Sequence, residues 1–161
     1  MNFAMPVMDP CYFCELARHG KQGWNFIDRD ALTMTVLNGR QYEPGQCIVF
    51  PVRHVATLLD LDDAEAAAVM RAAKRIGAAI TRALAPEALL LYQNNGILGG
   101  QEVPHFHLHV VPRTAGSDWG IGPPHLARIQ AGQRAAHRDF EIVTDEKRAS
   151  VRLLAAGISG S

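Results

Sequence analysis

The sequence predicts an α+β fold built on an antiparallel sheet, and the order of the expected elements is the main reason. Stretches rich in aromatic and β-branched residues dominate residues 24–52, one long helical stretch follows, and two strands joined by a short loop come after it. Consecutive strands joined by short connections pair antiparallel, whereas a parallel sheet needs a crossover between successive strands. We therefore expect an antiparallel α+β fold and not a doubly wound α/β fold.

The first half of the chain is expected to begin with a short helix and continue with strands. The helix, PCYFCELARH (10–19), ends at Gly20, a residue suited to a helix C-cap, and it places Cys11 and Cys14 one turn apart. The strands that follow are WNFID (24–28), ALTMTVLN (31–38) and, after a loop at 39–45, QCIVFPV (46–52).

The second half begins with the longest expected helix, residues 60–86, which has an Asp N-cap, Glu65 in its first turn and Pro86 at its end. Two strands follow on either side of a glycine-rich loop: ALLLYQNN (88–95), then GILGGQEV (96–103) as the loop, then HFHLHVV (105–111). The remaining chain predicts weaker helices near 124–137 and 144–156, the second with Thr144 as N-cap.

Composition and charge narrow the class of protein. The 161 residues are 48% hydrophobic and 20% charged, which is typical of one folded domain. The 16 Lys and Arg residues balance the 16 Asp and Glu residues, so no nucleic acid or anionic membrane is indicated as a partner. No signal peptide and no apolar stretch of membrane-spanning length is present, and we expect a cytoplasmic protein.

Three histidines, His105, His107 and His109, alternate with apolar residues in PHFHLHVVPR (104–113). Because strand side chains alternate between faces, the three imidazoles are expected on one face of a sheet. That face could be simply solvated. It could also supply two ligands to a metal ion, or it could carry out nucleophilic and acid–base chemistry on phosphorus. The neighbouring Gly99-Gly100 allows backbone N–H groups to converge on an anion, which suits a chain without net positive charge.

These residues carry a resemblance to a known family. The stretch QNNGILGGQEVPHFHLHVV (93–111), followed by Pro112-Arg113, resembles the signature of the histidine triad (HIT) family, and VLNGRQYEPGQCIVFPVRH (36–54) is similar to its nucleotide-pocket strand, loop and strand. The resemblance implies a homodimer in which two five-stranded antiparallel sheets join into one. It also implies a HIT domain over 1–113 and a C-terminal extension over 114–161, packed on the same domain or on the dimer partner.

For activity, the resemblance implies hydrolysis or transfer of a nucleoside monophosphate through a covalent nucleotidyl-histidine. The substrates would be purine nucleotides such as phosphoramidates or dinucleoside polyphosphates, and no organic cofactor would be needed. By position, His107 would be the nucleophile, His109 would contact the phosphate and assist the leaving group, and Asn94 would hydrogen-bond around the phosphate. The substrate-binding residues would be Asn38 at the ribose and the Gln101, Glu102 and Val103 segment, whose backbone amides would line the phosphate site.

Glu102 departs from the family pattern, in which many members carry Ser or Thr directly after the loop glutamine. A carboxylate about 4 Å from a phosphate oxygen costs about 4 kcal/mol at an effective dielectric near 20. We therefore expect Glu102 to point away, to pair with a cation such as Arg113, or to be protonated and act as an acid. Because of Glu102, the resemblance does not identify the leaving group.

The pair Cys11 and Cys14 could be a zinc half-site, a redox dithiol or two buried thiols. One branch of the HIT family binds structural zinc with such a pair and two histidines, and the resemblance assigns these to His54 and His105. Cys47, among apolar residues, is expected in the core. Trp119 is expected either to shape leaving-group specificity or to pack in the core.

Two other functions remain as alternatives at this point. One is a zinc-dependent hydrolase that uses the triad histidines as catalytic metal ligands. The other is a nucleotide-binding protein without catalysis, for which Glu102 is the motivating residue.

Overall fold

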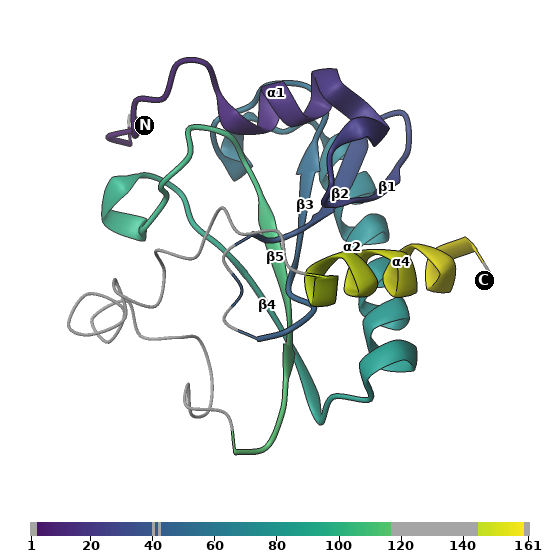
Figure 1. Ribbon diagram of the computed structural model, residues 1–161. Helices are drawn as coiled ribbons and strands as arrows, with labels where there is room; N and C mark the ends of the chain where they lie inside the picture. Colours follow the sequence, from purple (N-terminus) through teal and green to yellow (C-terminus); the bar gives the residue numbers. More distant parts are fainter. Residues whose placement is uncertain (1–2, 40, 42, 117–144, 160–161) are drawn as a thin grey trace.

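The computed structural model describes residues 3–39, 41, 43–116 and 145–159, and a five-stranded sheet is its central element (Figure 1). The strand order is β1-β2-β3-β5-β4, and every neighbouring pair is antiparallel. The antiparallel α+β prediction is therefore confirmed. The strands are β1 (Phe26–Arg29), β2 (Thr33–Leu37), β3 (Cys47–Pro51), β4 (Ala88–Gln93) and β5 (Leu108–Arg113).

Within the described residues, three α-helices pack around this sheet: α1 (Tyr12–His19), α2 (Asp63–Leu84) and α4 (Asp145–Ser159). The Asp62 carboxylate accepts a hydrogen bond from the Glu65 amide, and the Glu65 side chain accepts one from the Asp62 amide, so a complete capping box begins α2. The helix ends where Ala85 adopts a left-handed conformation ahead of Pro86. The predicted Asp cap is confirmed, although the expected helix began three residues too early because Leu58–Asp60 forms a separate 3-10 turn.

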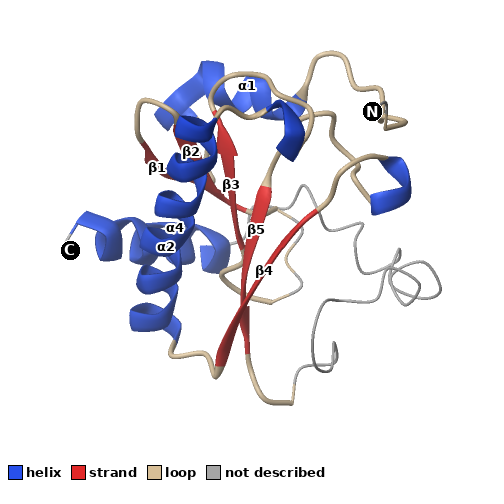
Figure 2. Ribbon diagram, turned by 180° about the vertical axis from the view of Figure 1, so that it is seen from behind, coloured by secondary structure: helices blue, strands red, loops and turns tan. Residues whose placement is uncertain are grey.

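The core has one cluster on each face of the sheet. On one face, α2 and α4 lie together, as Figure 2 shows, and they bury Phe106, Leu108 and Val110 with apolar residues of α2 and β3. On the opposite face, Phe13 and Ala17 of α1 pack on apolar side chains of β2 and β3. Helix α1 covers only part of its face, and the histidines lie beside it.

The predicted strand at 105–111 was wrong at both ends, since β5 begins at Leu108 and continues to Arg113. Pairing between β3 and β5 stops at Val49 and Leu108, and Pro51 further along β3 has no N–H to donate to a ladder. The Phe106 amide donates instead to Val55 O at 2.7 Å. His105 and His107 therefore precede the strand, yet the alternation of faces continues through them.

The C-terminal part of the chain contributes to the same core. Leu154 of α4 is fully buried in the cluster beneath α2, and Arg82 of α2 donates to Gly157 O at 2.6 Å. The helix expected at 144–156 is confirmed as α4, while the helix near 124–137, the Thr144 cap and Trp119 lie outside the described residues. None of the helices in the described ranges combines the length and hydropathy needed to cross a bilayer.

We predict that Leu154→Ala lowers the free energy of unfolding by about 2–5 kcal/mol, because it leaves a cavity between α4, α2 and the sheet. The matched control is Leu153→Ala on the same helix, whose side chain is 48% exposed and whose loss should cost less than about 0.5 kcal/mol. Urea unfolding of both variants measures the difference. Equal effects would show that α4 does not belong to the core in solution.

Candidate functional site

The three histidines of 104–113 lie on the sheet face that α1 partly covers. The His107 ring packs against Phe13 of α1 with ring centroids 4.8 Å apart. The centroid of the His109 ring lies 5.0 Å from that of His107, and the two ring planes meet at 74°. His105 contacts the same Phe13, with ring centroids 5.6 Å apart. The predicted common face is therefore confirmed, even though only His109 belongs to the strand proper.

His107 is held in one protonation form by its backbone neighbour. Its Nδ1 lies 2.8 Å from the carbonyl oxygen of His105, and a carbonyl can only accept, so Nδ1 carries the proton. In the neutral ring, Nε2 then holds a free electron pair. Burial lowers the pKa of His107, which keeps the imidazole neutral at neutral pH. This is the form that a nucleophilic histidine needs.

His109 is also neutral, but its contacts differ. Burial and the neighbouring His107 lower its pKa to about 3. Its ring stacks on Tyr92 of β4 with centroids 4.3 Å apart and an interplanar angle of 12°, because the two residues face each other across the β4–β5 pair. Its Nδ1 lies 3.2 Å from Nε2 of Gln46, which directly precedes β3.

The glycine-rich loop between β4 and β5 is held together by two predicted site residues. Gln101 is buried; its side-chain oxygen accepts from the Gly96 amide at 2.8 Å, and its nitrogen donates to Ala56 O and Val103 O at 2.8 and 2.9 Å. Asn94 donates to Gly100 O at 3.2 Å. Both side chains thus shape the loop that comes before the histidines.

Gly100, at φ 85°, adopts the left-handed conformation that glycine accommodates without strain and that turns the chain toward His105. Asn38, directly after β2, lies by alternation on the histidine face with Met34 and Val36. Its amide donates to Gln46 O at 2.9 Å, which ties the predicted ribose residue to the residue beside His109.

Glu102 is exposed, and its negative charge raises the pKa of His107 against the larger effect of burial. It therefore lies within electrostatic range of the nucleophile candidate. Arg113, proposed above as one partner for it, lies at the opposite end of β5 and places Nη1 at 3.5 Å from Oε1 of Glu43.

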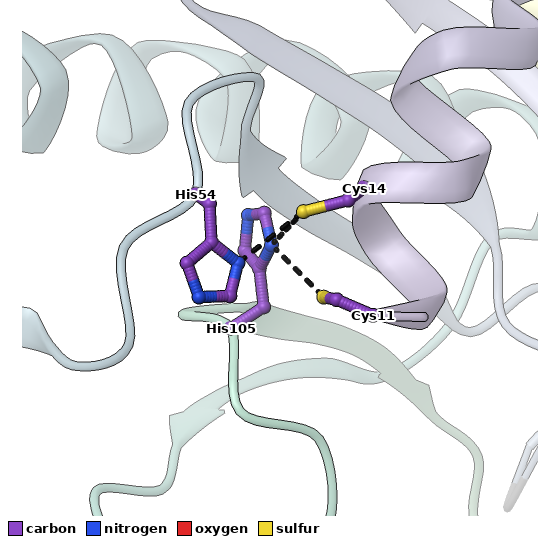
Figure 3. A group of neighbouring side chains, drawn as sticks. All are labelled: Cys11, Cys14, His54 and His105. Atoms are coloured by element: carbon purple, nitrogen blue, oxygen red, sulfur yellow. Dashed lines mark hydrogen bonds between the residues drawn. The ribbon is translucent and has the colours of Figure 1, made fainter. Parts of the chain in front are cut away.

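A second cluster, formed by Cys11, Cys14, His54 and His105, lies next to the first (Figure 3). Four potential ligand atoms, one from each side chain, lie within 4.8 Å of one another. Nδ1 of His105 is 3.5 Å from Sγ of Cys11 and 3.7 Å from Sγ of Cys14, and Nδ1 of His54 is 3.2 Å from Sγ of Cys14.

These distances fit a tetrahedral metal ion. Ligands at about 2.3 Å (sulfur) and about 2.0 Å (nitrogen) from zinc stand about 3.5 Å apart, which is close to the separations found. His105 Nε2 donates to Pro51 O at 2.9 Å, which leaves Nδ1 unprotonated and aimed at the thiols. Burial and the adjacent Cys11 raise the pKa of Cys14 to about 11, so a metal would have to displace its proton.

The three histidines have different surroundings. Among the described residues, the group able to hold a metal contains His105 but neither His107 nor His109. Sequence reasoning missed Gln46, Tyr92 and Phe13, which surround His107 and His109. The alternation of β3 could have indicated Gln46, two residues before Ile48, but the contact of Phe13 depends on how α1 packs.

Comparisons with known proteins agree with this geometry. The model of the HIT domain family matches residues 21–116. An adenosine 5'-monophosphoramidase of Schizosaccharomyces pombe is 29% identical over 70% of this chain and 80% of its own length, and an AP-4-A phosphorylase of Mycobacterium tuberculosis is 33% identical over 65% of this chain and 54% of its own. The crystal structure of a Zn-bound histidine triad family protein from Mycobacterium smegmatis has a TM-score of 0.73 at 24% identity, and the match covers 94% of this chain and 95% of that one.

Proposed function

Because this chain belongs to the HIT domain family, we propose that it cleaves purine nucleotides at the α-phosphate and that His107 forms the covalent nucleotidyl intermediate. The observation that carries the proposal is the hydrogen bond of 2.8 Å from His107 Nδ1 to His105 O. It directs the free electron pair to Nε2, and the lowered pKa of His107 keeps that pair unprotonated at neutral pH.

The proposed reaction has two displacements. First, Nε2 of His107 bonds to the α-phosphorus while the bond from phosphorus to the leaving atom breaks, and the leaving group departs with that electron pair; an amine leaving group takes up a proton from water as it departs. Second, water or another acceptor attacks the same phosphorus and releases a proton to solvent, while the bond from phosphorus to Nε2 of His107 breaks and its electron pair returns to the imidazole. We propose that His109, half-buried beside His107, donates from Nε2 to the phosphate during both steps.

The substrate class follows from what the named relatives share and from Glu102. One relative is named for a phosphoramidate and another for a dinucleoside polyphosphate, and both substrates join a nucleoside to the leaving group through its α-phosphate. Glu102 adds a negative charge near His107, which disfavours a polyphosphate leaving group and has no such effect on an uncharged amine. We therefore infer that phosphoramidates are the preferred class.

We also infer that Cys11, Cys14, His54 and His105 hold a structural zinc ion. All four positions would be filled by protein side chains, and such closed sites stabilise folds, whereas catalytic sites keep one position open. The ion would join α1 to the segment before β5 and so keep Phe13 against His107. A zinc-dependent hydrolase is less well supported, because neither His107 nor His109 belongs to this group of described residues.

A homodimer is the assembly that we propose, formed through β4 and α2. β4 is an edge strand of the five-stranded sheet, and edge strands present unpaired backbone groups. Beside it, mostly apolar residues of α2 and β4 line a groove: Met70, Ala73, Lys74, Gly77, Ala78, Thr81, Leu89 and Leu91. Met70 is 56% exposed and Leu91 42% exposed, which is costly unless a partner covers them.

We predict that incubation with adenosine phosphoramidate gives an adenylylated peptide containing residues 104–113, with the adduct on His107. Mass spectrometry of rapidly quenched samples detects it, and diadenosine polyphosphate should give less adduct at equal concentration. His107→Ala should abolish adduct and turnover, while His19→Ala, a change at an exposed histidine of α1, should change neither. Turnover that survives in His107→Ala would rule out the covalent route, and nucleotide binding without adduct or product would favour a non-catalytic protein.

We predict one zinc ion per chain, measured by elemental analysis of the purified protein. Cys14→Ala should lose the ion and lower the melting temperature, whereas Cys47→Ala, which alters a buried cysteine outside the cluster, should keep it. Chelation should act through stability alone. If a chelated chain that still melts at the original temperature loses adduct formation, the metal is catalytic and the structural assignment fails.

We predict that Leu91→Lys converts the dimer to a monomer, because it adds a second positive charge to a groove that already contains Lys74 and removes a large apolar side chain from it. Leu59→Lys, at a residue that is 61% exposed outside the groove, is the matched control and should leave the dimer intact. Sedimentation equilibrium gives the mass of each variant. A wild-type monomer at micromolar concentration, or a dimer that persists in Leu91→Lys, would contradict this interface.

A further inference from the structure

Gln46 is a fully buried polar side chain on the histidine face of the sheet. Its backbone is held on both sides, since its amide donates to Glu43 O at 3.1 Å and its carbonyl accepts from the Asn38 amide at 2.9 Å. Ile48 is the register partner of His109, so Gln46 lies diagonally across the β3–β5 pair from that ring. The side-chain amide nitrogen is 3.2 Å from Nδ1 of His109.

The direction of this hydrogen bond decides where the proton of His109 lies. An amide nitrogen only donates, so Nδ1 of His109 must accept, and in a neutral ring the proton is then on Nε2. Burial and His107 lower the pKa of His109 to about 3, so the ring is neutral at neutral pH. Its chemical state then depends only on which of the two nitrogens carries the single proton.

Two further contacts fix the orientation of the same ring. Tyr92 stacks on one face at 4.3 Å and 12°, and His107 meets the ring at 5.0 Å and 74°. A flip of the ring about its Cβ–Cγ bond would put Cδ2 in the place of Nδ1, break the hydrogen bond to Gln46 and leave a buried amide without that acceptor, which costs about 1–3 kcal/mol. The ring is thus constrained in both tautomer and direction.

We propose that Gln46 is a positioning residue, whose side-chain amide keeps His109 in the Nε2–H form and directs this N–H away from β3 toward the bound phosphate. The proposal rests on the proposed function for its catalytic meaning. The role of Gln46 is to determine which nitrogen of His109 donates, and Tyr92 supports it by holding the ring plane. Gln46 itself does not contact the reacting atoms.

The first test needs no substrate. Nitrogen-15 NMR of the imidazoles in the wild-type protein at neutral pH should show His109 with a protonated Nε2 and an unprotonated, hydrogen-bonded Nδ1. In Gln46→Glu, the carboxylate replaces the donor with an acceptor, so Nδ1 should become protonated. In Gln46→Met, which keeps the volume and removes the donor, the Nδ1 hydrogen-bond signature should disappear. An Nδ1–H signal for His109 in the wild-type protein would overturn the proposal.

The second test measures catalysis with adenosine phosphoramidate. In Gln46→Met, kcat and kcat/KM should fall together, about 10- to 100-fold, because the hydrogen bond of His109 to phosphate matters most in the transition state. The control is Gln22→Met, at an exposed glutamine, which should change neither the NMR spectrum of His109 nor the rates. Full kcat in Gln46→Met with a normal fold would refute the positioning role.

The two tests separate this proposal from the proposed function. If His109 has the expected tautomer but no adduct forms on His107, the covalent mechanism fails and the assignment of Gln46 as tautomer donor stands. If the adduct forms and Gln46→Met turns over at the wild-type rate, the covalent mechanism stands and the role of Gln46 fails.

Discussion

The hydrogen bond from His107 Nδ1 to the carbonyl oxygen of His105 is the interaction on which the rest of the site depends. Each histidine of the motif has one ring nitrogen committed to a different partner, and that partner sets the task of the other nitrogen. A carbonyl at Pro51 turns His105 Nδ1 toward the cysteines, and a carbonyl at His105 frees Nε2 of His107. An amide at Gln46 places the proton of His109 on the opposite nitrogen. Three chemically identical rings thereby differ in which nitrogen carries the proton and in the direction of the other nitrogen.

Burial is the second requirement, and α1 supplies much of it. Phe13 contacts both His105 and His107 and packs on Phe50 at 4.7 Å, so one side chain covers the face on which the imidazoles lie. Burial is the largest cause of the lowered pKa of each of the three histidines. The neutral form of His107 at neutral pH, which its proposed role as nucleophile needs, is therefore a consequence of burial to which helix packing contributes. A metal ion in the cysteine–histidine cluster would fix the end of α1 nearest to these rings and so link the stability of the helix to the protonation state of the motif.

The parts of the fold and the site that depend on short stretches of sequence, with a clear periodicity or spacing, were predictable. The alternation at 105–109 correctly placed three imidazoles on one face, and the Asp cap of α2 was recognisable from its capping pattern. The start of β5 was mispredicted because pairing between β3 and β5 ends near Pro51 of β3. The sequence of residues 105–111 alone does not contain this information. Gln46 was missed for the same reason, since its contact with His109 depends on sheet register. The cysteines and histidines of the cysteine–histidine cluster are up to 94 residues apart in the sequence. Only the resemblance to a family allowed them to be assigned to one site from the sequence.

His105 belongs to both clusters through different atoms, so a substitution of its side chain affects the two clusters differently. The imidazole of His105 faces Cys11 and Cys14, while its backbone oxygen holds His107. A substitution at this position removes the ring but cannot remove the carbonyl, so any effect on His107 must arise from movement of the backbone. The His105 amide donates to Val103 O at 2.8 Å and Phe106 donates to Val55 O at 2.7 Å, so backbone hydrogen bonds hold this segment independently of the ring. His107, the proposed nucleophile, is thus positioned by main-chain geometry, and a metal ion bound by the ring of His105 would fasten that geometry to α1.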